Sequence, residues 1–165
     1  MARVAEAELK QLAGALSAKL AARKWSVATA ESCTGGLVGQ LLTALPGCSG
    51  WYERGFIAYS NVAKTEMLGV PAATLDTFGA VSEETALAMA TGALAHSRAQ
   101  ASLSITGIAG PAGGTPEKPV GLVCYGWALT DGTVLTSTCR LSGDREEIRT
   151  RAAASALRGL IELMG

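Results

Sequence analysis

Two small nucleophilic side chains, Ser32 and Cys33, are adjacent in a segment that reads Ala-Glu-Ser-Cys-Thr-Gly-Gly over residues 30–36. The segment joins a predicted strand to a predicted helix, so the free N–H groups of that helix would face the turn and suit an oxyanion. A helix N-terminus also lowers a thiol pKa, which makes Cys33 the rival nucleophile. Successive strand residues point to opposite faces, so only one of the two can face a pocket. Alternatively, Ser32 or Thr34 simply caps the helix, and the turn by itself favours the cap.

Tyr59 and Lys64 flank a second predicted junction between a strand and a helix, with the phenol at the strand end and the amine about one helical turn further on. This spacing can direct both side chains to one site. A lysine desolvated in an apolar pocket can be neutral at pH 7 and can then act as general base toward a serine. That relay matters because His96 is the only histidine in the chain, and we expect a surface role for it. The ordinary alternative is that Lys64 is a solvated helix lysine.

A glycine-rich loop is predicted over residues 107–119, directly after another strand that ends near Thr106. Its backbone N–H groups can cradle a phosphate or a carboxylate. Gly107, Gly110 and Gly113 follow the spacing G-x-x-G-x-x-G, which matches neither the dinucleotide fingerprint nor the P-loop. An Ω-like structural loop is the alternative, although a glycine-rich loop of this length in a compact domain is usually functional.

Three arginines, Arg145, Arg149 and Arg151, stand at the start of the last predicted helix. The helix dipole disfavours positive charge at this end, so the cluster can be held there to meet an anion. Ion pairs with the acidic residues of the same turns explain it equally well.

Helices alternate with the early strands, and a hairpin closes the series. In the first half of the chain, the predicted elements are a helix over residues 3–22, a strand over 25–30, a helix from Leu37, a strand over 52–59, a short helix capped by Asn61 that ends at Leu68 before Gly69, and a turn from Pro71. In the second half, they are a helix from Ser82 to about Arg98, a strand over 101–106, and two strands over 120–129 and 133–141 that flank Asp131-Gly132. A final helix begins with a capping box of Asp144 and Glu147. This order predicts a three-layer α/β/α sandwich on a mixed sheet, in which residues 1–165 form a single domain.

Composition narrows the class of protein. The 165 residues include 14 Lys+Arg and 14 Asp+Glu, and 48% of them are hydrophobic. The high hydrophobic content excludes a disordered chain. The balanced charge lacks the excess of basic residues that nucleic-acid binding requires, but it is compatible with a small phosphorylated ligand. No signal core or membrane-length apolar run occurs, so we expect a cytoplasmic protein without membrane contact. Four cysteines without a C-x-x-C pair predict no zinc site, and the apolar, weakly charged chain suggests a homodimer.

Together these motifs resemble the CinA C-terminal domain family, from about Leu9 to the last helix. The motifs that carry the resemblance are Thr-Ala-Glu-Ser-Cys-Thr-Gly-Gly at 29–36, Tyr-Ser-Asn at 59–61 with Lys64, Leu-Gly-Val at 68–70, Gly-Ala-Val-Ser at 79–82, Thr-Gly-Ile-Ala-Gly-Pro at 106–111, and Gly-Gly-Thr-Pro-Glu-Lys-Pro-Val-Gly at 113–121. Members of this family include nicotinamide mononucleotide deamidases of the PncC type, so the resemblance implies an amidohydrolase domain.

The implied reaction is hydrolysis of nicotinamide mononucleotide to nicotinic acid mononucleotide and ammonia, a step that recycles pyridine nucleotide toward NAD without a metal or other cofactor. The resemblance implies Ser32 as nucleophile, Lys64 as its base and Tyr59 as a relay or orienting hydroxyl. Backbone N–H groups would hold the oxyanion, and the glycine-rich loop with Arg145 or Arg149 would hold the ribose phosphate. The oxyanion and substrate contacts so implied are Thr34, Gly35, Gly36, Thr106, Gly107, Gly110, Arg145 and Arg149.

A second hypothesis belongs to another class: a non-catalytic nucleotide-binding or regulatory module of the same family. The same loops would then bind a phosphorylated ligand, and Lys64 would be an ordinary charged anchor. Binding without turnover distinguishes this module from the serine–lysine amidase.

Overall fold

One mixed five-stranded sheet, in the order β2-β1-β3-β4-β5, organises the molecule. The computed structural model describes residues 6–165. β1 is parallel to β2 and β3, whereas β4 is antiparallel to β3 and β5. The strands are β1 (Val27–Glu31), β2 (Tyr52–Ile57), β3 (Ala101–Gly107), β4 (Leu122–Leu129) and β5 (Val134–Arg140).

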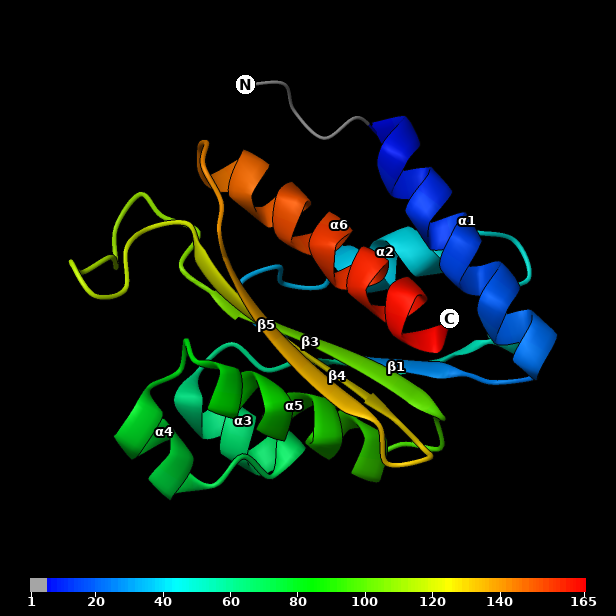
Figure 1. Cartoon of the computed structure of the whole chain (residues 1–165), viewed down its shortest axis with the longest axis horizontal. Helices are drawn as coiled ribbons and strands as arrows, with labels where there is room; N and C mark the ends of the chain where they lie inside the picture. The colour runs from blue at the N-terminus through cyan, green and yellow to red at the C-terminus, as the bar shows by residue number, and fades with distance from the viewer. Residues whose placement is uncertain (1–5) are drawn as a thin grey trace.

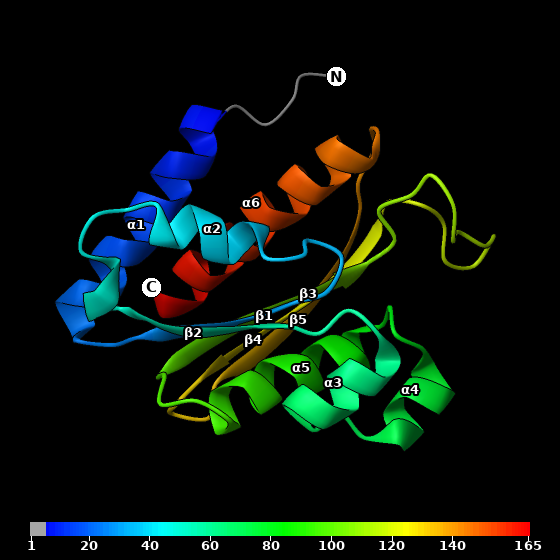
Figure 2. The same ribbon diagram turned by 180° about the vertical axis from the view of Figure 1, so that it is seen from behind.

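Helices cover both faces of the sheet, which confirms the predicted three-layer α/β/α sandwich (Figure 1). The upper layer in that view holds α1 (Glu6–Arg23), α2 (Leu37–Thr43) and α6 (Arg145–Met164). The lower layer holds α3 (Asn61–Leu68), α4 (Ala72–Phe78) and α5 (Glu83–Ala95), and the view from behind shows the same division (Figure 2). A 3₁₀ turn, η1 (Cys48–Gly50), precedes β2. Within residues 6–165 no helix is long and apolar enough to cross a bilayer.

Several predicted element ends are confirmed by their caps. Ser82 accepts a hydrogen bond from the N–H of Thr85 at the start of α5, and the Asp144–Glu147 capping box opens α6. Gly69 ends α3 in the left-handed conformation, and the hairpin turns at Gly132 with φ 94°. For the first helix, residues 3–5 of the predicted range lie outside the described residues.

Three local predictions were wrong. The cap of α3 is Ser60, whose hydroxyl accepts from the N–H of Ala63 at 3.0 Å, and Asn61 is instead the first helical residue. Pro71 is the N-cap of a helix, α4, and does not merely begin a turn, because its carbonyl accepts hydrogen bonds from the N–H groups of Thr74 and Leu75. α5 ends at Ala95, before the predicted Arg98, and His96 is its C-cap, with Nδ1 2.8 Å from the carbonyl of Gly92.

Strict alternation along β1 and the residues that follow it divides the core into two clusters. Val27 and Cys33 pack in the cluster that contains side chains of α1 and α6. Ala28 and Ala30 pack in the other cluster, with side chains of α3 and α5. The even-numbered positions therefore face the α3–α5 layer, and the same alternation sends Ser32 toward that layer.

The carboxyl ends of β1 and β3 lie side by side where the chain changes direction in the sheet. β1 leads to β2 through α2 in one layer, whereas β2 leads to β3 through α3, α4 and α5 in the other. Such a switch point leaves a crevice outside the strand ends, where α/β proteins place their ligands. Here the N–H of Ser32 donates to the carbonyl of Ile105 at 3.0 Å, which joins the serine turn to the strand that leads into the glycine-rich loop.

Candidate active site

The serine turn meets α3 through a direct contact between two side chains. Lys64 Nζ donates to Ser32 Oγ at 3.2 Å, and Ser32 Oγ lies 3.4 Å from the carbonyl oxygen of Tyr59. Ser32 is 6% exposed, so its hydroxyl sits in a nearly closed environment. Lys64 is the fourth residue of α3 and lies on the buried face of this helix.

Lys64 is a buried amine without a carboxylate partner. It is 2% exposed, and no Asp or Glu of the described residues forms an ion pair with it. Its Nζ donates to the carbonyl of Tyr59 at 2.8 Å, which fixes the direction of the amine. Burial lowers the pKa of Lys64, because the ammonium form loses its hydration. In its neutral form the amine has a lone pair that can take a proton from Ser32.

Cys33 points away from this pair, as strand alternation predicts. Its side chain belongs to the cluster on the α1–α6 side. Burial raises the pKa of the Cys33 thiol to about 12, although the positive charge of Arg149 opposes the shift. A thiol buried in apolar surroundings is unreactive, so the geometry favours Ser32 as the nucleophile.

Glu31 is the principal feature of the site that sequence reasoning missed. Its carboxylate is 2% exposed and accepts hydrogen bonds from Thr34 Oγ1 at 2.6 Å, the N–H of Val38 at 3.0 Å and the N–H of Gly39 at 3.0 Å. Glu31 therefore satisfies the N-terminus of α2 in place of an ordinary cap.

The predicted alternative, in which Ser32 or Thr34 caps this helix, is wrong. The N-cap position of α2 is Gly36, and no side chain bonds there as a cap. The missed signal is an acidic residue at the end of a buried strand, six positions before the helix begins.

Two glycines give the serine turn its shape. Gly35 has φ 59°, and a Cβ on it would lie 3.3 Å from Arg149 Nη2. Gly36 has φ 105°, and a Cβ on it would meet Ile57 Cδ1 at 3.0 Å. The N–H of Gly35 donates to the carbonyl of Ser32 at 3.0 Å. In contrast, nothing in residues 6–165 accepts a hydrogen bond from the N–H of Thr34, which is fully buried, or from that of Gly36.

The arginines at the start of α6 contact both predicted loops. Arg145 Nη1 donates to the carbonyl of Gly110 at 2.7 Å. Arg149 donates to the carbonyls of Cys33 at 3.0 Å and Thr34 at 2.9 Å. Arg151 Nη2 lies 3.6 Å from Glu147 Oε2, an ion pair with an acidic residue of the same turns, as the sequence predicts. The ion-pair explanation does not describe Arg149, because its hydrogen-bond partners are main-chain carbonyls of the serine turn.

The glycine-rich loop is anchored at its base and exposed beyond it. Thr106 Oγ1 donates to the carbonyl of Ala80 at 2.7 Å, and Gly107 packs on β4, where a Cβ would meet Val123 Cγ2 at 2.8 Å. Gly110 has φ 81°. Residues 111–117 are exposed throughout.

The structure does not bring the phenol of Tyr59 to Ser32 or Lys64. This side chain is 62% exposed, whereas the carbonyl of the same residue contacts both partners of the pair. Tyr59 therefore contributes its main chain to the described site. Ile57 and Val62, which are 54% and 65% exposed, are also open to solvent near Tyr59 in the sequence.

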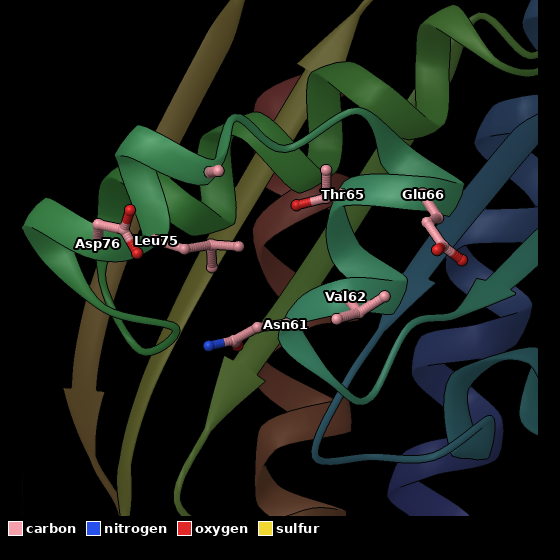
Figure 3. Close-up of a pocket in the computed structure, with 7 residues that line it drawn as sticks. Asn61, Val62, Thr65, Glu66, Leu75 and Asp76 are labelled. Carbon is pink, nitrogen blue, oxygen red and sulfur yellow. The ribbon is translucent and has the colours of Figure 1, made fainter.

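A separate pocket of about 370 Å³ lies between α3 and α4 (Figure 3). The side chains labelled in the figure include Asn61 and Val62 of α3 and Leu75 and Asp76 of α4. None of the residues predicted for the site lines this pocket. Among residues 6–165, no group of three or more His, Cys, Asp or Glu side chains is arranged to hold a metal ion.

The fold and the site together define an α/β domain with a buried serine–lysine pair at a switch point of its sheet. Residues 9–164 match the model of the CinA C-terminal domain. The chain therefore belongs to the CinA C-terminal domain family.

Several known proteins resemble the chain over nearly its whole length. It is 48% identical over 155 residues to the nicotinamide-nucleotide amidohydrolase PncC of Escherichia coli (strain K12), a match that covers 94% of each chain. It is 48% identical over 154 residues to the protein of the same name from Enterobacter agglomerans, covering 93% of this chain and 94% of the relative. The crystal structure of competence/damage inducible protein CihA from Agrobacterium tumefaciens matches with a TM-score of 0.95 at 45% identity, over 100% of both chains.

Proposed function

We propose that this protein is a nicotinamide-nucleotide amidohydrolase, which converts nicotinamide mononucleotide and water to nicotinic acid mononucleotide and ammonia. The observation that carries the proposal is the buried Lys64 Nζ, 3.2 Å from Ser32 Oγ, in a chain of this family. The names of the PncC relatives supply the substrate. Their similarity over nearly the whole of both chains supports the same reaction here.

Acylation begins when neutral Lys64 takes the proton of Ser32 as Oγ attacks the carboxamide carbon. The carbonyl of Tyr59 accepts one N–H of Lys64 at 2.8 Å, so the amine is held in place during the transfer. The resulting ammonium of Lys64 then protonates the amide nitrogen, and the C–N bond breaks to release ammonia. The nucleotide is left as an ester on Ser32.

Deacylation reverses these roles. Water enters the position that ammonia has left, and Lys64 takes its proton as the oxygen attacks the ester carbon. The bond between that carbon and Ser32 Oγ breaks, and Lys64 returns the proton to Ser32. The new carboxylic acid loses its proton to water, and the product leaves as a carboxylate. The backbone N–H groups of Thr34 and Gly36 are the free donors beside Ser32 for the tetrahedral oxyanion of both steps, and one such donor contributes about 3–4 kcal/mol.

The ribose phosphate is assigned to the exposed loop and the first turn of α6. Thr106, Gly107 and Gly110 lie at the base of this loop, and Arg145 is tied to it through the carbonyl of Gly110. Arg145 is exposed and can turn toward a phosphate, an anion that guanidinium groups bind through two parallel hydrogen bonds. The exposed phenol of Tyr59 is assigned to the substrate side of the pair as an orienting hydroxyl.

We place this reaction in the cytoplasm, as a step of pyridine nucleotide recycling. We also propose that a homodimer carries it out. Four unpaired cysteines are consistent with a reducing compartment. The exposed apolar side chains Ile57, Tyr59 and Val62 support a subunit contact near the site. Light scattering of the purified protein checks the mass, and a monomer at all concentrations contradicts the dimer.

The test of the proposed function is ammonia release from nicotinamide mononucleotide in the presence of a chelator. The wild type is expected to turn over, and Ser32→Ala to lose about 10³-fold or more in kcat. Ser17→Ala is the matched control, because the Ser17 hydroxyl bonds only within α1, to the carbonyl of Gly14. Nucleotide binding by the wild type without turnover would support the non-catalytic regulatory module instead.

A further inference from the structure

Arg149 reaches from the second turn of α6 to two successive peptide groups of the serine turn. Its Nε donates to the carbonyl of Cys33 at 3.0 Å, and its Nη2 donates to the carbonyl of Thr34 at 2.9 Å. A guanidinium group offers its donors in a planar fork, so two bonds fix both carbonyl directions at once. The contact joins residues 116 positions apart in the chain, and nothing in the local sequence of the turn provides it.

The direction of the Cys33 carbonyl determines where the N–H of Thr34 points. The peptide bond between these residues is trans, and in a trans peptide the C=O and N–H groups point in opposite directions. Because the Cys33 carbonyl points at Arg149 in α6, the N–H of Thr34 points away from α6. Lys64 reaches Ser32 from α3, in the opposite layer. The N–H of Thr34 is thus aimed to the side on which the nucleophile is activated.

The neighbouring donor of the turn is already used. The N–H of Gly35 donates to the carbonyl of Ser32, whereas the N–H of Thr34 has no acceptor among residues 6–165. The guanidinium charge on the carbonyl side also polarises the peptide between Cys33 and Thr34, which makes its N–H a stronger donor. Of the two N–H groups of the turn without an acceptor, those of Thr34 and Gly36, only that of Thr34 belongs to a peptide whose carbonyl Arg149 holds.

We propose that Arg149 is a positioning residue that presents the N–H of Thr34 to the oxyanion formed on attack by Ser32. This inference rests on the proposed amidase function and assigns Arg149 a role in the chemical step in place of phosphate binding. Arg149 is half-buried and holds two carbonyls, whereas Arg145 is exposed. Phosphate recognition then falls to Arg145 and the glycine-rich loop.

The two roles are separated by comparing nicotinamide mononucleotide with its dephosphorylated nucleoside as substrates for Arg149→Met. A positioning role predicts that kcat falls about 100-fold on either substrate while KM changes little, because an oxyanion donor acts in the transition state. Arg149→Lys is expected to lie between Met and wild type, since an ammonium can hold one carbonyl but not two. Arg158→Met is the control on the same helix, because Arg158 pairs with Glu8 on the surface.

A higher KM that is confined to the nucleotide, with kcat unchanged, overturns the positioning role and assigns Arg149 to the phosphate. An unchanged kcat on both substrates overturns it as well. If Arg149→Met does not fold, Arg149→Lys carries the comparison, and wild-type kcat in that variant contradicts the inference. A wild type that releases no ammonia refutes the proposed function itself, an outcome distinct from turnover that survives the loss of Arg149.

Discussion

The serine turn and the glycine-rich loop both follow a parallel strand at the same edge of the sheet, yet they are built differently. Residues 31–34 are buried, and the turn is bonded by the Glu31 carboxylate and by Arg149. The loop is exposed over residues 111–117. At its base the N–H of Ile108 donates to the carbonyl of Leu122 in β4, and the N–H of Gly121 donates to the carbonyl of Ile108. Beyond the base, Thr115 and Lys118 hydrogen-bond to each other. Chemistry requires fixed atoms, whereas ligand recognition tolerates an adaptable segment.

The largest effect is expected at Lys64. Lys64→Met removes the base and is expected to lower kcat by about 10²–10⁴-fold, without loss of folding, because a buried amine without an ion-pair partner is replaced by an apolar side chain of similar length. Ammonia release and thermal unfolding of the same preparation provide the measurement. Retention of full activity would remove lysine from the mechanism.

The pH profile of the wild type tests the same residue. Only neutral Lys64 is a base, so kcat/KM is expected to rise with pH and level off below the ordinary lysine value of 10.5, because burial lowers the pKa of Lys64. Over that range the unfolded chain binds more protons than the folded one, so the free energy of unfolding also rises with pH. Both rises are expected to disappear in Lys64→Met, and a flat wild-type profile argues against a neutral lysine base.

Glu31→Gln weakens the rigid turn with almost no change of shape. The new amide NH₂ would face the N–H groups or the hydroxyl from which Glu31 now accepts hydrogen bonds. The free energy of unfolding is therefore expected to fall by about 1–3 kcal/mol. Denaturant unfolding measures this loss. Glu66→Gln on the exposed side of α3 is the control and is expected to change it by less than about 0.5 kcal/mol. Equal losses in the two variants would deny Glu31 its anchoring role.

A pair of glycine substitutions compares the two regions directly. Gly35→Ala and Gly113→Ala both place a side chain at positive φ, but the new Cβ meets Arg149 Nη2 at 3.3 Å in the turn and only Ile108 Cγ2 at 3.7 Å in the loop. We expect Gly35→Ala to cost about 1–2 kcal/mol of stability and to lower kcat. Gly113→Ala, in an exposed loop that can relax, is expected to cost less than about 1 kcal/mol and to leave kcat unchanged. The reverse order would contradict the division into a rigid and an adaptable region.

The smallest effect is expected from thiol alkylation. Burial raises the pKa of Cys33 to about 12, and the residue is 6% exposed, so iodoacetamide near neutral pH should leave it unmodified and activity intact. Peptide mapping with the more exposed Cys48 as reference checks this. Loss of activity in proportion to labelling of Cys33 would restore the thiol as a candidate nucleophile.

Local patterns predicted much of the fold. The caps at Ser82 and Asp144 and the Asp131-Gly132 hairpin depend on residues close in sequence, and the structure has all three. Alternation along β1 also predicted that Ser32 and Cys33 diverge, because side-chain direction in a strand is set by the backbone alone.

Contacts between distant segments could not be predicted from the sequence. For Arg149 the sequence predicts an anion ligand or an ion-pair partner, because nothing near it in the chain indicates the carbonyls of Cys33 and Thr34. Glu31 was missed because its partners Val38 and Gly39 come within reach only after α2 turns back over the strand end. For Tyr59, the residue type drew attention to the phenol, although its carbonyl is the group that contacts Lys64.

The central claim, an ester formed on Ser32 by a lysine-activated attack, is tested most directly by acid quench during turnover of nicotinamide mononucleotide, followed by peptide mass mapping. The account predicts an adduct equal to the substrate minus ammonia on the peptide that contains Ser32, localised to that residue by fragmentation. The adduct should be absent from Ser32→Ala. The same adduct on Cys33, or its persistence in Ser32→Ala, would contradict the account.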